Sequence, residues 1–174
     1  MGLPNLGYRA YAEMIPELTR FGKPVIASIA GLCEDDFLTM ARVINQARPD
    51  LIEVNLSCPN IPGKPQIAYD PVDSERLLKR VRPLITVPMG VKLPPYFDPA
   101  HHAVMADVIR RCGVDYLNLI NSVGNGLVVD AKRETPVIKP KGGFGGLGGS
   151  LIKPVALANV RAFWKLLEGR IPII

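Results

Sequence analysis

The chain has 174 residues, 48% of them hydrophobic, which is enough for one domain with a buried core and excludes a disordered protein. Its apolar runs fall far short of the roughly 18 residues that indicate a membrane span, and its N-terminus lacks the basic start and apolar block of a signal peptide. The formal charge of +5 comes from scattered Lys and Arg without interleaved aromatic residues, so we expect neither a nucleic-acid nor a membrane partner.

The chain contains three cysteines, Cys33, Cys58 and Cys112. An odd and sparse set argues against a disulfide framework. We therefore expect a reducing compartment, the cytoplasm, and we expect each cysteine to serve packing or chemistry rather than cross-linking.

The first half of the chain alternates short Val- and Ile-rich runs with helical patterns. Strands are predicted at residues 24–31 and 51–56, and helices at residues 33–47 and 70–81. The helix at 70–81 has a clear start, because Asp70 suits the N-cap and Pro71 suits the first helical position.

The second half continues the alternation. It predicts strands at 87–93 and 115–121, helices at 98–113 and 153–169, a long Gly- and Lys-rich loop before the last helix, and a strand beginning within 170–174. Asp98 and Pro99 repeat the helix start, and Gly113 marks the end of that helix. His101 and His102 fall in its first turn, where we expect surface residues.

Alternating strands and helices predict an α/β fold with a parallel sheet. The order favours a (β/α)8 TIM barrel over a doubly wound sheet, but a closed barrel typically needs about 250 residues and eight strands. The chain supplies about four strand–helix units. We therefore expect residues 1–174 to form either an open sheet or a single partial barrel domain.

Polar residues follow three successive strands: Asn55 and Cys58 after the second, Lys92 at the end of the third, and Asn121 with Ser122 after the fourth. The carboxyl ends of parallel strands meet at one edge of the sheet, where ligands bind in α/β folds. The sequence therefore predicts a ligand site at this edge.

Cys58 can be interpreted as a nucleophile, a general base, a metal ligand or a small packing residue. The absence of a nearby second cysteine, and the position of both histidines on another element, weaken the metal and Cys-His protease hypotheses. The flanking amides and hydroxyl favour a reactive thiol over a packing residue.

The remaining motifs have ordinary alternatives. Lys92 either extends to solvent or holds an anion, and the stretch 120–130 on its own reads as a turn. The stretch GFGGLG at 143–148 matches a dinucleotide fingerprint, with Glu168 at the appropriate spacing, but no good strand precedes it and the next helix starts only near Lys153. We expect these glycines to let a loop pass close to a flat ligand instead.

Four stretches, NLSCPNIPGKPQIAYD, GVKLPPYFD, NSVGNGLVVD and KPKGGFGGLGG, occur in this order and closely resemble the class 1A dihydroorotate dehydrogenases. The likeness runs essentially from end to end. It implies a soluble enzyme of pyrimidine synthesis with a (β/α)8 barrel, in which FMN and the pyrimidine stack at the carboxyl-terminal face of the strands. It also implies a homodimer for the complete enzyme.

The resemblance also implies roles for individual residues. Cys58 would remove a proton from C5 of dihydroorotate while the hydride from C6 passes to the flavin, giving orotate, and the electrons would then reduce fumarate to succinate. The residues implied in substrate binding are Met1, Gly2, Leu3, Asn55, Asn60, Asn121 and Ser122. Those implied in cofactor binding are Asn55, Lys92 and Gly149.

In the family, one strand with a ligand-binding lysine precedes the matching region, and glycine loops that hold the FMN phosphate follow it. We therefore expect this chain to be an interior piece of such an enzyme, truncated at both ends and inactive by itself. The alternative hypothesis is a catalytically silent α/β module that folds only with a partner chain.

Overall fold

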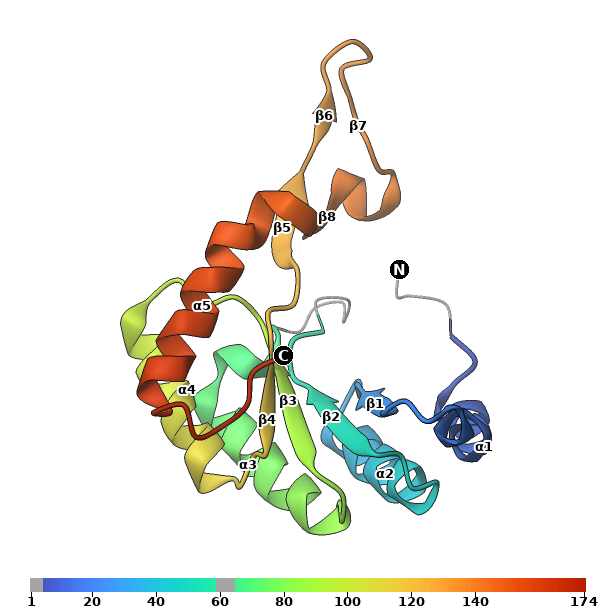
Figure 1. Cartoon of the computed structure of the whole chain (residues 1–174). Coiled ribbons are helices and arrows are strands. Elements are labelled where there is room, and N and C mark those ends of the chain that lie inside the picture. Colours follow the sequence, from blue (N-terminus) through green and yellow to red (C-terminus); the bar gives the residue numbers. More distant parts are fainter. Residues whose placement is uncertain (1–4, 59–64) are drawn as a thin grey trace.

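A computed structural model, which describes residues 5–58 and 65–174, shows a twisted parallel sheet backed by helices (Figure 1). Within these residues the main sheet has the order β1-β2-β3-β4, with every neighbouring pair parallel. Its strands are β1 (Ile26–Ile29), β2 (Leu51–Asn55), β3 (Met89–Leu93) and β4 (Tyr116–Leu119). Ile173 forms a further parallel bridge to Leu117, beside β4. The predicted α/β architecture, that of part of a (β/α)8 barrel, is confirmed.

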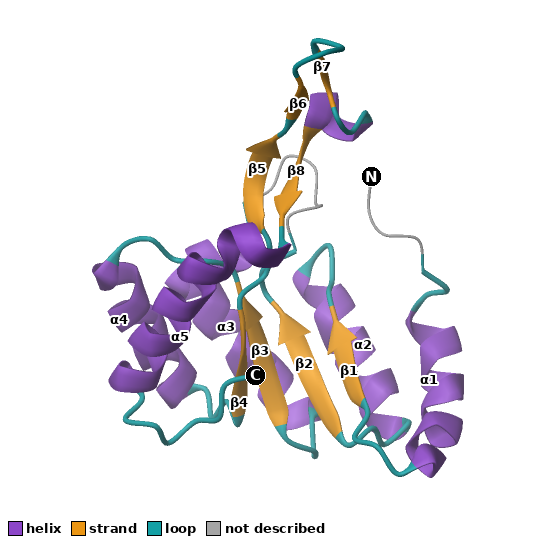
Figure 2. Cartoon of the chain, turned by 45° about the horizontal axis from the view of Figure 1, so that its top comes forward, coloured by secondary structure: helices purple, strands orange, loops and turns teal. Residues whose placement is uncertain are grey.

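The helices are α1 (Tyr8–Leu18), α2 (Glu34–Gln46), α3 (Pro71–Val81), α4 (Pro99–Arg111) and α5 (Lys153–Leu166). Short 3-10 turns lie at Thr19–Phe21, Ile67–Tyr69, Arg82–Leu84, Pro140–Gly143 and Gly149–Ile152. Figure 2 shows α2 and α3 behind the sheet and α4 to its left, so that the other face of the sheet, called the inner face below, is not covered by them. No helix in the described residues is both long and apolar enough to cross a membrane.

The two faces of the sheet differ in chemistry because side chains alternate along a strand. Ile52 and Val54 of β2 are fully buried against the helices, together with Val91 of β3 and Leu117 of β4. The residues between them project to the inner face, where β2 presents Glu53 and Asn55, β3 presents Gly90 and Lys92, and β4 presents Tyr116 and Asn118. The apolar core therefore supports a polar inner face.

The predicted helix starts are confirmed. The Asp70 carboxylate accepts hydrogen bonds from the backbone N–H groups of Val72 and Asp73 at 2.9 and 3.0 Å. Asp98 accepts one from Ala100 at 2.7 Å. These caps fix the points at which α3 and α4 leave the carboxyl-terminal edge of the sheet.

The region expected to be a long loop forms antiparallel ribbons instead. β5 (Val123–Leu127) pairs with β8 (Phe144–Leu147), and β6 (Val129–Asp130) pairs with β7 (Thr135–Pro136). This arm, residues 123–147, projects beyond the carboxyl-terminal ends of the main strands (Figure 1). The stretch GFGGLG contributes β8 rather than a tight strand-to-helix turn, which argues against the dinucleotide hypothesis.

The expectation that His102 lies on the surface is wrong, because α5 packs across the start of α4 and buries it. His102 is 8% exposed, with Nδ1 lying 2.9 Å from the Asp98 carbonyl oxygen and Nε2 lying 3.0 Å from Asn159 Oδ1. Its ring also contacts that of Phe163, with centroids 5.3 Å apart. His101 is exposed, as predicted.

Candidate active site

Three strands align a row of polar side chains at the carboxyl-terminal part of the inner face. Asn55 is the register partner of Lys92, and Lys92 is the register partner of Asn118. All three side chains are half-buried. Sequence analysis missed Asn118, although the alternation of β4 could have indicated it.

The segment around Cys58 begins with a turn built by Asn55. Its Oδ1 accepts a hydrogen bond from the Ser57 backbone N–H at 3.0 Å and another from the Ser57 hydroxyl at 2.9 Å. This arrangement leaves Cys58 half-buried just beyond the end of β2. In the described segments the Asn55 amide N–H2 has no hydrogen-bond partner, so it remains available as a donor to a ligand.

Asn121 ties the ends of β2 and β4 together. Its Nδ2 donates to the Ser57 carbonyl oxygen at 2.7 Å and to Ser57 Oγ at 3.0 Å, while its Oδ1 accepts from the backbone N–H of Ser122 at 2.8 Å. Ser57 is completely buried beneath this bridge. The amide thus closes a connection within the protein, and its contact with a pyrimidine remains a prediction.

The glycine-rich strand β8 passes directly over Ser122. A Cβ added at Gly146 would lie 2.2 Å from Ser122 Oγ, so only glycine permits this approach. Gly149 follows in an exposed turn with a φ of 73° and open space around it. The glycine stretch thus approaches a protein side chain closely at Gly146, and its passage close to a flat ligand remains a prediction.

Hydrogen bonds join the two ends of the segment that contains Cys58, and they tie its second end to the chain that follows β3. The Ala68 N–H donates to the Leu56 carbonyl at 3.1 Å. Tyr96 donates to the Ala68 carbonyl at 2.6 Å, and Tyr69 donates to the Pro95 carbonyl at 3.1 Å. Burial, with a smaller effect from Tyr69, raises the pKa of Tyr96, which keeps its hydroxyl a neutral donor.

Some predicted residues cannot be placed. Met1, Gly2, Leu3 and Asn60 lie outside the described residues, so their roles remain predictions. Among the residues that are described, all three cysteines are free, and no group of three or more His, Cys, Asp or Glu side chains could hold a metal ion.

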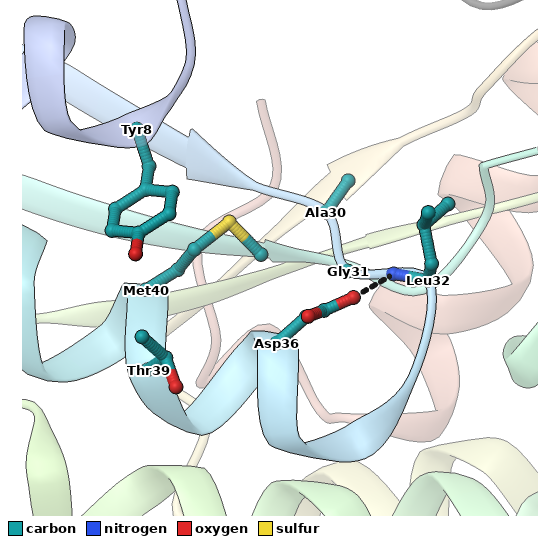
Figure 3. Close-up of a pocket in the computed structure, with 7 residues that line it drawn as sticks. All are labelled: Tyr8, Ala30, Gly31, Leu32, Asp36, Thr39 and Met40. Carbon is teal, nitrogen blue, oxygen red and sulfur yellow. Dashed lines mark hydrogen bonds between the residues drawn. The ribbon is translucent and has the colours of Figure 1, made fainter.

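A separate shallow pocket lies where β1 ends and α2 begins (Figure 3). Its lining residues are Tyr8, Ala30, Gly31, Leu32, Asp36, Thr39 and Met40. The Asp36 carboxylate accepts from the backbone N–H groups of Leu32 and Cys33 at 2.9 and 3.2 Å, and so caps α2. Of the predicted site residues that the structure describes, none lines this pocket, and we assign it no catalytic role.

Comparison with known proteins supports the resemblance along the whole chain. A family model described as dihydroorotate dehydrogenase matches residues 1–174. The chain is 48% identical over 178 residues to dihydroorotate dehydrogenase A (fumarate) of Lactococcus lactis subsp. lactis (strain IL1403). It is 49% identical over 178 residues to dihydroorotate dehydrogenase (fumarate) of Kluyveromyces lactis.

The chain belongs to the dihydroorotate dehydrogenase family. Both alignments cover 100% of this chain but only 57% and 56% of the two relatives. The chain thus spans little more than half the length of the curated relatives it matches. Membership in this family confirms the recognition made from the four sequence stretches.

The described residues fit the ring portion of a flavin. Asn55 offers an unpaired amide donor, Lys92 offers a cation in the same row, and Gly146 allows a strand to approach closely above Ser122. A flat cofactor that becomes anionic on reduction is suited by such fixed donors and a nearby cation. The polar groups at the carboxyl-terminal edge of the sheet are therefore chemically suited to the cofactor that the family resemblance implies.

Proposed function

We propose that the complete protein oxidises dihydroorotate to orotate with FMN as cofactor, and that fumarate accepts the electrons and becomes succinate. The observation that carries this proposal is the Asn55–Lys92–Asn118 row, with Cys58 three residues after Asn55 in the chain, in a sequence that matches the family throughout. The names of the relatives support fumarate as the acceptor.

Cys58 would act as the base. A proton next to a carbonyl is acidic enough for a positioned thiolate, provided that fixed donors stabilise the charge that develops on the substrate oxygen. The thiolate takes the proton from C5, and the hydride leaves from C6, so orotate carries the new double bond. FMN, when bound, would supply the acceptor for that hydride.

The neighbouring residues would hold and orient the two rings. The free N–H2 of Asn55 would donate to a ring oxygen, and the Lys92 ammonium would balance negative charge on the cofactor. Asn60, Asn121, Ser122 and the backbone at residues 1–3 would complete the substrate pocket, and Gly149 the cofactor site. Each role extends the family resemblance to the matching position of this chain.

We further propose that residues 1–174 form one partial barrel domain and that the complete enzyme is a homodimer. The arm supports association because it exposes apolar side chains, namely Leu127, Val128, Val129, Val137, Ile138 and Phe144. Exposed apolar clusters of this kind mark interaction surfaces. Sedimentation of the complete protein should give twice the subunit mass, and a monomer would contradict this proposal.

The function is tested by mixing the complete, oxidised protein with dihydroorotate in the absence of oxygen. The flavin band should bleach, orotate should form, and the subsequent addition of fumarate should restore the band. Bleaching without recovery would exclude fumarate as acceptor, and a colourless preparation would contradict the use of FMN.

A catalytically silent α/β module is the second candidate. It is favoured by β1, whose outer edge pairs with no strand in the described part of the chain. An unpaired edge of a parallel sheet requires cover from another segment or chain. Turnover by the complete protein would exclude this candidate.

Replacement of Asn121 by Ala in the complete enzyme is expected to weaken orotate binding by about 1–3 kcal/mol. The reason is that the polar group of orotate that Asn121 would bind is left buried without a partner. Titration of the flavin spectrum with orotate measures the affinity. Since Asn121 also bridges to Ser57, thermal unfolding must be followed in parallel. Unchanged affinity with lowered stability would show that Asn121 only closes the bridge.

A further inference from the structure

The inner face buries a carboxylate that the proposed reaction does not use. Glu53 is 3% exposed. Its Oε1 accepts a hydrogen bond from the Ser28 hydroxyl and its Oε2 accepts one from Asn118 Nδ2, both at 2.6 Å. These donors satisfy the oxygen atoms but carry no charge, and a buried charge is costly unless an opposite charge lies nearby.

The register of the sheet identifies Lys92 as the candidate for that opposite charge. Glu53 is the partner of Gly90 on β3, and Lys92 is the next residue of β3 on the same face. Asn118 on β4 is the register partner of Lys92 and at the same time the hydrogen-bond donor to Glu53. The residue that donates to the carboxylate is thus also the neighbour of the lysine across the strand pair.

The contact between Glu53 on β2 and Asn118 on β4 crosses β3, where Gly90 carries no side chain and leaves room for Tyr116. A Cβ at Gly90 would lie 2.1 Å from the Tyr116 ring, which lies over this glycine. The Tyr116 hydroxyl is buried without a hydrogen-bond partner in the described residues. Burial, and to a smaller extent the charge of Glu53, raises the pKa of Tyr116.

Glu53 and Lys92 are the charged side chains that the described parts of β1 to β4 place on the inner face. The others there are neutral, including Ser28, Tyr116 and Asn118. No direct ion pair joins Glu53 and Lys92 in the described part of the chain, so their coupling would act through space and through the Asn118 amide. Because Asn118 donates its N–H2 to Glu53, its carbonyl oxygen is left for other donors in the row.

We propose that Glu53 is the buried counter-charge of Lys92, and that through Asn118 it sets the positive charge that the site presents to the flavin. This inference rests on the proposed function. Glu53 is a positioning residue, since it touches neither substrate nor cofactor in the proposed site. Its negative charge offsets the lysine, so its removal should favour the reduced, anionic flavin.

The test is the reduction equilibrium of the flavin in the complete protein, measured against a redox dye. Glu53→Gln should raise the equilibrium constant for two-electron reduction about tenfold, which corresponds to about 30 mV. Ser28→Ala is the matched control, because it removes one hydrogen bond from the same carboxylate and leaves the charge in place. It should leave the equilibrium constant as in the unmodified protein, and an unchanged constant in Glu53→Gln as well would overturn the inference.

Thermal unfolding gives a second, independent measure in case Glu53→Gln folds poorly. The double variant Glu53→Gln/Lys92→Gln removes both charges, so it should lose less stability than the sum of the two single changes. Strictly additive losses would overturn the inference. If the wild-type flavin bleaches with dihydroorotate but the Glu53 and Lys92 variants show no coupling, the proposed function stands and the inference on Glu53 falls. A wild-type protein without flavin would overturn both the proposed function and the inference.

Discussion

Cys58→Ser in the complete enzyme is expected to slow flavin reduction by dihydroorotate by about 100-fold or more near neutral pH, the usual range for loss of a general base. Free thiols have a pKa of about 8.5, whereas a serine hydroxyl stays protonated far above that pH. The rate should therefore recover partly as the pH rises. Stopped-flow measurement of flavin bleaching across pH measures both effects.

The chain offers a matched control for this substitution. Cys33 is exposed and occupies the N-cap of α2, a position that serine fills well. The flavin of the Cys33→Ser variant should be reduced by dihydroorotate at the same rate as that of the unmodified enzyme. If Cys58→Ser also bleached at that rate near neutral pH, Cys58 would not be the base.

A polypeptide of these 174 residues alone is expected to associate, to purify without yellow FMN and to show no dihydroorotate oxidation. Four parallel strands cannot close an eight-stranded barrel, so the edge of β1 and the polar inner face lack the cover that a closed barrel provides. By the family resemblance, the phosphate loops lie outside this segment, and the phosphate normally contributes much of the anchoring of such a cofactor.

Absorbance in the flavin region, recorded together with size-exclusion chromatography, measures this outcome. The complete protein, purified in the same way, is the control and should be yellow and active. A monodisperse, yellow and active preparation of the 174-residue polypeptide would contradict the barrel argument and would show that these residues suffice to hold the cofactor.

The main sheet and its helices could be predicted because each element carries its own pattern. The Asp-Pro starts at Asp70 and Asp98 set the helix boundaries locally, and the Val- and Ile-rich runs set the strands. α1 was missed because Gly7 provides no side-chain cap, its first turn has no acidic residue, and Pro16 falls in its last turn. The arm was missed because its glycines form strands only through pairing across the ribbon.

The site could be predicted less completely, because part of it depends on contacts between strands. Position at or just beyond the end of a strand was enough to single out Asn55, Cys58 and Lys92. The buried state of His102 follows from α5, which is distant in sequence, and the bond between Glu53 and Asn118 depends on the register of three strands. No local pattern carries that information.

The backbone hydrogen bond from Ala68 to Leu56 bears on how the length of the segment between them, which contains Cys58, can vary between relatives. Because this bond and the two tyrosine hydroxyls fix both ends of the segment, residues could be inserted or deleted between them without displacing β2 or α3. Doubling a loop costs only about 0.6 kcal/mol in closure entropy. A single residue inserted within β2 would instead exchange its polar and apolar faces. A change of length in this segment would therefore leave the sheet beneath it in place.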